Sequence, residues 1–167
     1  MTKEDEVAVI DVPVENRAEL RWILEDSFEG WYLRHSMGTL ESVETVRAAV
    51  SAGSPLGLVM LKMLGPTSGY VFYIAVARAH RREGVARVLL DDALGRFKSA
   101  GAKEVFASVE EDNEPSERLF ASAGFSKTSF GEVSKAHGRL RAVNMYRMMR
   151  VVPGEALLRK LLAQAGA

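Results

Sequence analysis

The segment from residue 79 to 94, AHRREGVARVLLDDAL, combines basic side chains, a glycine and apolar residues at helical spacing. The apolar residues recur every four positions from Val85, so a helix is expected to begin just after Gly84. The free N–H groups and the dipole at the start of a helix favour an anion such as a phosphate. Gly84 lets a ligand approach the backbone, while Arg81 and Arg82 add charged donors. The segment therefore predicts a phosphate or pyrophosphate site.

The class of phosphate ligand is narrowed by two patterns that the sequence lacks. Neither GxxxxGK[ST] nor GxGxxG occurs in the chain, so the phosphate loops of the common nucleotide folds are not indicated. The plainer alternative is that the basic residues are simply solvated and Gly84 is a turn residue.

The composition limits the partners and the chemistry. The 167 residues are enough for one domain, and 22 basic residues balance 22 acidic ones. Such a balance gives no overall field to attract nucleic acid or an anionic membrane. No cysteine is present, which excludes disulfides, thiolate metal sites and a cysteine-bound intermediate. The acidic start and the charges that interrupt the apolar runs predict a cytoplasmic protein with no membrane segment. No metal is expected.

Hydrophobic periodicity predicts the elements that position this segment. Strands are expected at 7–12, 46–50, 56–64, 70–77, 104–110, 126–133 and 139–150. Helices are expected at 17–35, with a break near Gly30, and at 85–98, 113–125 and 154–167. The apolar run 70–77 is typical of a central strand, and its crossover to 104–110 should be right-handed and parallel. We expect an α/β fold with a mixed sheet, as one domain over 1–152 followed by a C-terminal helical extension over 153–167.

Two motifs resemble those of one protein family. IAVARAHRREGVARVLL is similar to the acyl-coenzyme A signature of the GNAT superfamily of N-acetyltransferases, [R/Q]-x-x-G-x-[G/A], through Arg81, Gly84 and Ala86. The second signature is an Asn followed by a helix that ends in L-[Y/F]-x-x-x-G-F, matched by Asn113, Leu119, Phe120, Gly124 and Phe125. Two motifs in the right order are more specific than either alone. The resemblance spans roughly residues 7 to 150.

The resemblance implies a centrally splayed sheet flanked by helices and a site for acetyl-coenzyme A. The backbone of the strand that ends at Val76 would pair with the pantetheine arm, and the loop that follows would hold the pyrophosphate. The cofactor-binding residues that it implies are Ile74, Ala75, Val76, Arg81, Arg82, Glu83, Gly84, Val85, Ala86, Asn113 and Phe120.

Phe120 departs from the family pattern. Many members have a tyrosine here that protonates the departing thiolate, and phenylalanine has no proton to give. Losing a general acid typically costs about 10²–10⁴ in rate. Tyr73, Tyr146 and His35 are the possible substitutes, although a tyrosine on an apolar strand usually belongs to the core and a histidine that ends a helix usually lies on the surface.

Glu110 and Glu111, at the end of the strand 104–110, are the candidates for the general base. Strand alternation directs them to opposite faces, so at most one faces the site. The amide of Val76 would donate to the oxyanion, and the amine would attack the thioester directly. The alternative is that both glutamates are solvated charges at a strand end.

The acceptor amine should lie over residues 27 to 40, because the helical segment after the first strand forms the acceptor side in this family. Aromatic side chains there suit an apolar amine and acidic ones a cationic amine, so small amines, polyamines and peptide N-termini all stay open. The alternative is that the aromatic residues form the core face of the helix. The substrate-binding candidates are Phe28, Glu29, Trp31, Tyr32 and Tyr73.

The sequence thus predicts an acetyl-coenzyme A-dependent N-acetyltransferase acting on a primary amine. One alternative is a coenzyme A-binding regulatory module with little turnover, in which Phe120 marks a lost acid. Another is an anion- or nucleotide-binding interaction protein that matches the signatures by chance. The apolar stripe at 157–162 suggests a homodimer through the last helix or the final strands, and the alternative is that this stripe packs on its own domain.

Overall fold

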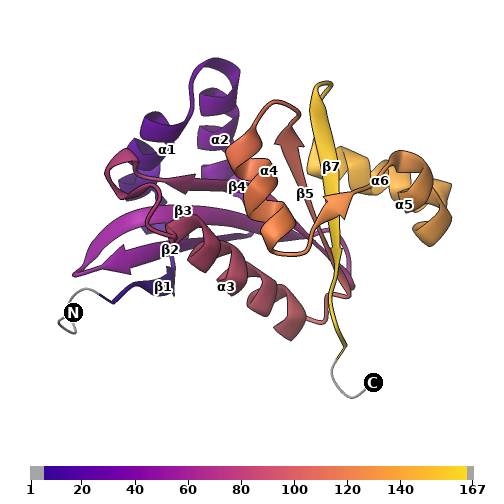
Figure 1. Cartoon of the computed structure of the whole chain (residues 1–167), viewed down its shortest axis with the longest axis horizontal. Helices are drawn as coiled ribbons and strands as arrows, with labels where there is room; N and C mark the ends of the chain where they lie inside the picture. The colour runs from indigo at the N-terminus through magenta and orange to yellow at the C-terminus, as the bar shows by residue number, and fades with distance from the viewer. Residues whose placement is uncertain (1–5, 165–167) are drawn as a thin grey trace. The chain divides into compact units, whose positions relative to one another are not determined.

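The computed structural model describes residues 6–164 of the chain (Figure 1). The acidic residues at the start of the sequence and the last three residues of the expected terminal helix lie outside this range. The strands are β1 (Ala8–Asp11), β2 (Thr45–Ser51), β3 (Ser54–Met63), β4 (Ser68–Val76), β5 (Glu104–Glu110), β6 (Ser126–Lys127) and β7 (Glu155–Leu161). The α-helices are α1 (Arg21–Ser27), α2 (Gly30–Ser42), α3 (Val85–Ser99), α4 (Glu114–Ser122), α5 (Phe130–His137) and α6 (Arg139–Met149), with 3₁₀ helices η2 (Val14–Leu20) and η3 (Arg78–His80).

The strands form a mixed seven-stranded sheet in the order β1-β2-β3-β4-β5-β7-β6. β4 and β5 are parallel, whereas β1 with β2, β2 with β3, β5 with β7 and β6 with β7 are antiparallel. The predicted mixed sheet flanked by helices is confirmed. The described chain divides into two compact units: unit 1 holds the residues up to Lys62 and Tyr73–Gly95, and unit 2 holds Met63–Phe72 and the residues from Arg96 on.

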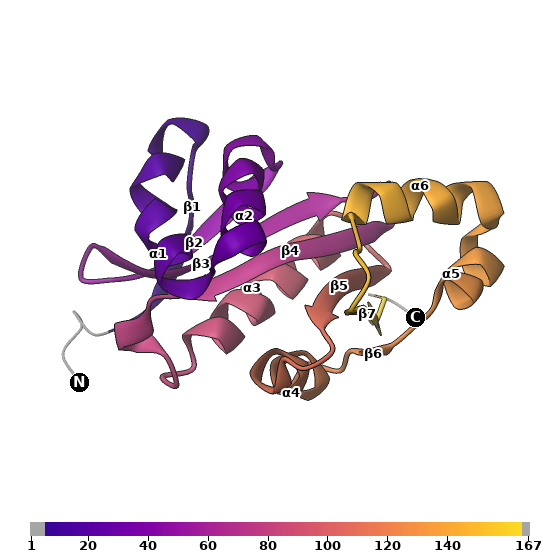
Figure 2. The same cartoon turned by 90° about the horizontal axis from the view of Figure 1, so that it is seen from above.

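In unit 1, helices cover both faces of the strands: α1 and α2 lie on one face and α3 on the other (Figure 2). β3 is buried without interruption from Leu56 to Leu61, as expected for a strand covered on both sides. Gly57 lies so close to its neighbours that a Cβ there would stand 2.7 Å from Ala75 O. The strands predicted at 46–50 and 56–64 are confirmed as β2 and β3. They form an antiparallel hairpin that turns through Ala52 and Gly53, both with positive φ.

The predicted break in the first helical region is confirmed. α1 ends at Ser27, Phe28 and Glu29 are extended, and Gly30 begins α2 with φ +55°. The buried Arg17 in η2 donates from Nη1 to Leu40 O at 3.0 Å and to Val43 O at 2.7 Å, which satisfies carbonyls at the end of α2.

In unit 2, the parallel register of β4 and β5 runs from Ser68↔Glu104 to Val71↔Ala107. Both strands extend past the last registered pair, β4 to Val76 and β5 to Glu110. On its other side β5 pairs with β7 along its whole length. α4 lies on one side of these strands and α6 on the other (Figure 2). The core of this unit comprises Leu64, Tyr70, Phe106, Val133, Ala142, Met145, Met149 and Leu157.

The strands predicted at 126–133 and 139–150 are wrong beyond the first two residues. Only Ser126–Lys127 is a strand, and α5 then begins after Ser129, whose Oγ accepts from Glu132 N at 3.2 Å. In α6 the buried residues are spaced three and four apart, which is the period of a helix and not of a strand. The apolar content of this region was mistaken for β-propensity.

The C-terminal helical extension predicted at 153–167 is also wrong in its described part. Residues Glu155–Leu161 form β7, which is paired with both β5 and β6. Leu157 and Leu158 are each only 5% exposed because adjacent residues of a strand face opposite sides, and both sides are covered here. Leu161, which a helical stripe would bury, is 66% exposed. The spacing of these leucines fits both the helical period and the strand period. The pairing of Glu155–Leu161 with β5 shows that the segment is a strand.

This correction predicts different costs for two leucine truncations. Leu157→Ala should lower the free energy of unfolding by about 2–5 kcal/mol, because it opens a cavity in the core of unit 2. Leu161→Ala should change it by less than about 0.5 kcal/mol, because its side chain is exposed. Urea unfolding of both variants measures the difference, and equal losses would support a helix over this segment.

Candidate active site

The loop between β4 and α3, in unit 1, has an unusual backbone. Arg82 has φ +65° and Gly84 φ +82°, so two nearly adjacent residues are left-handed. The amide of Val88 donates to Gly84 O at 3.1 Å. The N–H groups before Val88 thus belong to the first turn, where a helix offers no acceptor of its own. A Cβ built on Gly84 would meet no atom within 4 Å, so the backbone is open to a ligand there.

The two arginines of the loop have different surroundings. Arg81 donates from Nη2 to Asp26 O at 2.8 Å and from Nε to Val76 O at 3.2 Å. Its guanidinium thus joins the end of α1 to the end of β4, and it positions the loop. Arg82 is exposed and has no side-chain hydrogen bond or ion pair within residues 6–164. Its charge is available to a ligand.

The end of β4 lies against the same loop in unit 1. Ala75 is buried, whereas Ile74 and Val76 are half-buried. Arg78 N donates to Asp26 Oδ2 at 2.6 Å, and Ala77 N donates to Leu56 O at 2.8 Å. These bonds fix the path of the chain from the strand into the loop.

The aromatic residues predicted to bind the acceptor amine lie together in one cluster in unit 1. The ring of Phe28 lies edge-on to Tyr73, with centroids 5.3 Å apart, and Trp31 stacks on His35 at 4.8 Å. Tyr32 lies edge-on to Trp31 at 5.0 Å. The alternative that these rings form the core does not hold for Trp31, which is 46% exposed.

A hydrogen bond that the sequence did not predict links the two sides of this cluster. His35 Nδ1 lies 2.5 Å from Tyr73 Oη. The two residues were singled out separately as replacements for the missing acid, but nothing in the sequence pairs a helix residue with a strand residue 38 positions away. Glu29, at the start of α2, is exposed.

Unit 2 holds the remaining predicted site residues. Glu110 and Glu111 are exposed, as the alternative of solvated charges predicts. Asn113 caps α4, because its Oδ1 accepts from Ser116 N at 3.3 Å. Phe120 is buried and packs edge-on against Phe125 at 5.1 Å between centroids. The predicted residues therefore fall into two groups, one in each unit.

A polar chain at the end of β5 was missed. Tyr70 Oη and Ser108 Oγ are 2.7 Å apart, and Ser108 Oγ donates to Glu155 Oε2 at 3.5 Å. Glu155 Oε1 accepts from Val152 N at 2.9 Å. Burial raises the pKa of Glu155, the bonds from Val152 and Ser108 lower it, and the charge of Glu110 raises it, for a net increase. Glu155 escaped notice because its segment was predicted to be a helix.

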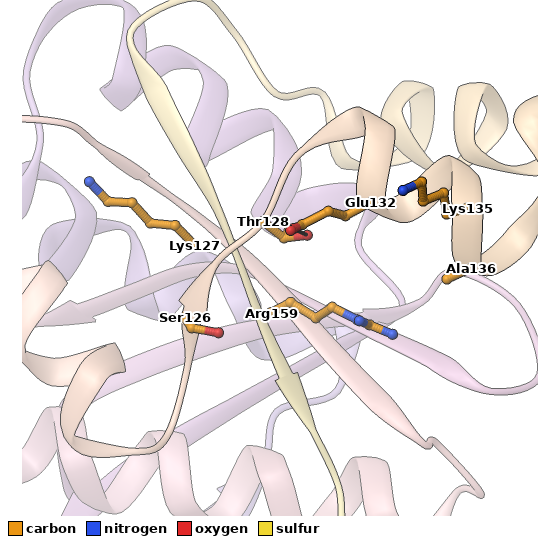
Figure 3. A pocket seen from close by; sticks show the side chains of 7 residues that line it. All are labelled: Ser126, Lys127, Thr128, Glu132, Lys135, Ala136 and Arg159. Atoms are coloured by element: carbon orange, nitrogen blue, oxygen red, sulfur yellow. Dashed lines mark hydrogen bonds between the residues drawn. The ribbon is translucent and has the colours of Figure 1, made fainter.

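A separate pocket of about 630 Å³ lies in unit 2 and contains none of the predicted site residues (Figure 3). It is lined by Ser126, Lys127, Thr128, Glu132, Lys135, Ala136 and Arg159. Arg159 Nε donates to the buried Glu104 at 2.8 Å, and Thr128 Oγ1 donates to Glu132 at 2.8 Å. Lys127 points away from the other cations (Figure 3).

Residues 6–164 hold neither an evident metal site nor a membrane-spanning helix. No group of three or more His, Asp or Glu side chains in this range is arranged to hold a metal ion. None of the helices there is long and apolar enough to cross a bilayer.

The family model of the acetyltransferase (GNAT) family matches residues 15–125, about two thirds of the chain. The chain belongs to this family. The resemblance seen in the two signatures is thereby confirmed, and so is the prediction of an acyltransferase. No curated protein sequence matches this GNAT acetyltransferase.

Several solved structures share the fold of this GNAT acetyltransferase at low sequence identity. The ribosomal-protein-S18-alanine N-acetyltransferase from Escherichia coli has a TM-score of 0.71 and 13% identity, over 96% of this chain and 97% of that one. The IAA acetyltransferase from Bacillus cereus has a TM-score of 0.69 and 20% identity, over 94% and 100%. The PaiA N-acetyltransferase from Thermoplasma acidophilum, solved with coenzyme A, has a TM-score of 0.70 and 10% identity, over 94% and 99%.

The raised pKa of Glu155 predicts a pH dependence of stability. Between its ordinary pKa of 4.5 and the raised value, the unfolded chain releases this proton while the folded chain keeps it. Rising pH therefore favours unfolding of the wild type in this window. Glu155→Gln has no such proton, so its free energy of unfolding should rise relative to that of the wild type as pH increases through this window. Above the window the difference between the two proteins should be constant.

Urea unfolding of both proteins from pH 4 to pH 8 measures this difference. Glu41→Gln is the matched control, because that carboxylate is 68% exposed and pairs only with the surface residue Arg21. Its difference from the wild type should stay nearly flat, within about 0.5 kcal/mol. A flat curve for Glu155→Gln as well would show that burial does not raise this pKa.

Proposed function

We propose that this GNAT acetyltransferase transfers the acetyl group of acetyl-coenzyme A to a primary amine by direct attack in a ternary complex. The observation that supports this most is the left-handed loop with its open backbone at Gly84, directly ahead of α3. Such a loop offers several N–H donors to a pyrophosphate. The acyltransferase family membership supplies the reaction class.

The loop residues 81–86 fit the pyrophosphate of the cosubstrate. Arg82 supplies an unpaired charge, and Arg81 holds the loop to α1 and β4. The backbone of Ile74–Val76 would pair with the pantetheine amides, because β4 extends past its registered pairing with β5. Asn113, at the start of α4 in unit 2, remains a candidate through the second signature alone.

Transfer needs a stabilised oxyanion and a path for one proton. The Val76 amide is the proposed donor to the oxyanion. Glu110 and Glu111 are the sequence-based candidates for accepting the amine proton, and both side chains are exposed. No cysteine is present to form an acyl-enzyme through sulfur, which supports direct attack.

Tyr73 is the proposed replacement for the acid missing at Phe120. Its hydroxyl lies 2.5 Å from His35 Nδ1, so a proton given to the thiolate could be replaced from the imidazole. Tyr146 is a poorer candidate, because it packs edge-on against Phe130 and borders the core of unit 2.

The acceptor is proposed to be a small amine or a peptide amine that lies against Phe28, Trp31 and Tyr32. Partly exposed rings suit an apolar or aromatic body near the amine, and the exposed Glu29 suits a positive charge. A peptide acceptor has a parallel in the S18-alanine N-acetyltransferase, which shares the fold. We also propose a cytoplasmic location, no nucleic-acid partner, and a homodimer.

A coenzyme A-binding module with little turnover is the second candidate function. Phe120 favours it, because a phenylalanine at this position has no hydroxyl to protonate a thiolate. Acetylation of any amine by the purified protein separates the two candidates.

The cosubstrate site is tested by calorimetric titration with acetyl-coenzyme A, with ATP and NAD as controls. Wild-type protein should bind acetyl-coenzyme A selectively. Gly84→Ala should weaken binding about tenfold, because an alanine at positive φ costs roughly 1–2 kcal/mol and shifts the loop. Gly53→Ala is the matched control, since Gly53 has φ +79° in the β2–β3 turn with equally open surroundings. Equal binding of all three ligands, or equal losses in both variants, would contradict the site.

The acid role is tested by removing single hydroxyl groups. Tyr73→Phe should lower kcat about 10²–10⁴-fold with little change in the affinity for acetyl-coenzyme A, because it removes only a proton donor. Tyr146→Phe should leave kcat nearly unchanged. Phe120→Tyr in the Tyr73→Phe background should restore part of the rate. A kcat that Tyr73→Phe does not change would rule out this role.

A further inference from the structure

The pocket in unit 2 is formed by segments that are distant in the sequence (Figure 3). Ser126 and Lys127 lie on β6, Glu132 and Lys135 on α5, and Arg159 on β7. The register pairs Ser126 with Arg159, so β6 and β7 form one wall of the pocket, and α5 forms another (Figure 3). All of these residues belong to unit 2, so the pocket lies within one compact unit.

Arg159 is held in this pocket by a buried carboxylate behind it. Its Nε donates at 2.8 Å to Oε1 of Glu104, which is buried. The other oxygen of Glu104 accepts from Ser68 Oγ at 2.7 Å and lies 2.6 Å from His137 Nε2. A buried carboxylate with partners on both oxygens has little freedom, so it also restrains the guanidinium that it binds. The two terminal nitrogens of Arg159 have no other partner within residues 6–164, and they can bind a carboxylate as a fork.

Two charged side chains of α5 line the pocket and are not paired with an opposite charge. Lys135 has no hydrogen bond or ion pair within residues 6–164. Glu132 has no ion pair in the same range, and its Oε2 accepts from the neutral hydroxyl of Thr128 at 2.8 Å. The charge of Arg159 is compensated from behind, and Lys127 points away from the other cations (Figure 3). The pocket thus offers one uncompensated positive charge and one uncompensated negative charge.

We propose that this pocket binds a small polar amino acid in its zwitterionic form. The carboxylate of the ligand lies against the terminal nitrogens of Arg159 and the ammonium of Lys135, and the ammonium of the ligand faces the carboxylate of Glu132. A lining with charges of both signs suits a zwitterion better than phosphate, because Glu132 repels a second anion. Ala136 is the only apolar residue among the described ones that line the pocket, so a polar ligand side chain is favoured. The volume of about 630 Å³ leaves room for a ligand of this size.

This pocket is separate from the residues of unit 2 that the sequence suggests for acetyl transfer. Arg159 lies opposite Phe106 in the β5–β7 register and binds Glu104, the first residue of β5. Glu110 ends the same strand, and Asn113 follows it at the start of α4. The amino acid therefore binds at the other end of β5 from these candidates, and the proposal does not depend on the proposed acetyl transfer.

The test is a titration of the full-length protein with L-serine, followed by the NMR chemical shifts of the backbone amides. The shifts should reach saturation, and the largest should lie at residues 126–136 and 159. The analogue 3-hydroxypropionate lacks the ammonium and ethanolamine lacks the carboxylate, so each should bind about tenfold more weakly than L-serine. Inorganic phosphate should also bind more weakly than L-serine, because Glu132 repels it.

Variants of three exposed lining residues assign the contacts. Lys135→Gln should weaken L-serine binding about tenfold without weakening ethanolamine, and Glu132→Gln should do so without weakening 3-hydroxypropionate. Lys127→Gln is the matched control and should bind L-serine as the wild type does, because Lys127 points away from the other cations (Figure 3). The proposal would be overturned by shifts that do not saturate at these residues, by equal binding of L-serine and its two analogues, or by tighter binding of phosphate. Equal losses in Lys127→Gln and Lys135→Gln would also overturn it.

Discussion

The need of every backbone N–H and C=O for a partner is the constraint on which this structure depends. β4 meets it over Ser68–Val71 through its parallel pairing with β5, and that register then ends while the strand continues to Val76. Downstream, side chains supply some of the missing partners, since Arg81 Nε and Ser27 Oγ both donate to Val76 O. A strand whose pairing is incomplete is well suited to a ligand that has amides of its own, as pantetheine does.

Arg81 shows how a signature residue can hold a loop in place. The sequence suggests a phosphate donor, and the structure has its guanidinium on two backbone carbonyls, Asp26 O and Val76 O. This restraint fixes where the loop leaves the strand, so the left-handed residues after it have a defined position. Arg17 plays a comparable part in η2, where its buried guanidinium satisfies carbonyls at the end of α2. Burial of this guanidinium lowers the pKa of Arg17.

Sequence patterns predicted the elements from β2 to α4 well, because the hydrophobic period and the turn residues agree there. They failed after Lys127. The buried residues of α6 lie three and four apart, as in a helix, but the apolar content of this segment led to the prediction of a strand. The leucines of β7 have a spacing that fits both a helix and a strand, and only the pairing of β7 with β5 decides. The same error hid Glu155, whose partners on β4 and β5 are distant in sequence. The contact of His35 with Tyr73 was out of reach for the same reason, although each residue had been noticed.

The backbone at Arg82 has a consequence for how fast a ligand is captured. A non-glycine residue at φ +65° has a strained backbone, and the free energy of folding of the surrounding chain offsets the cost of this strain. For the phosphate site that we propose, a loop held in this shape by the fold would leave little ordering entropy to be lost on binding. Encounter would then depend on diffusion and on the attraction of the exposed guanidinium for an anion, so the association rate should fall as ionic strength rises.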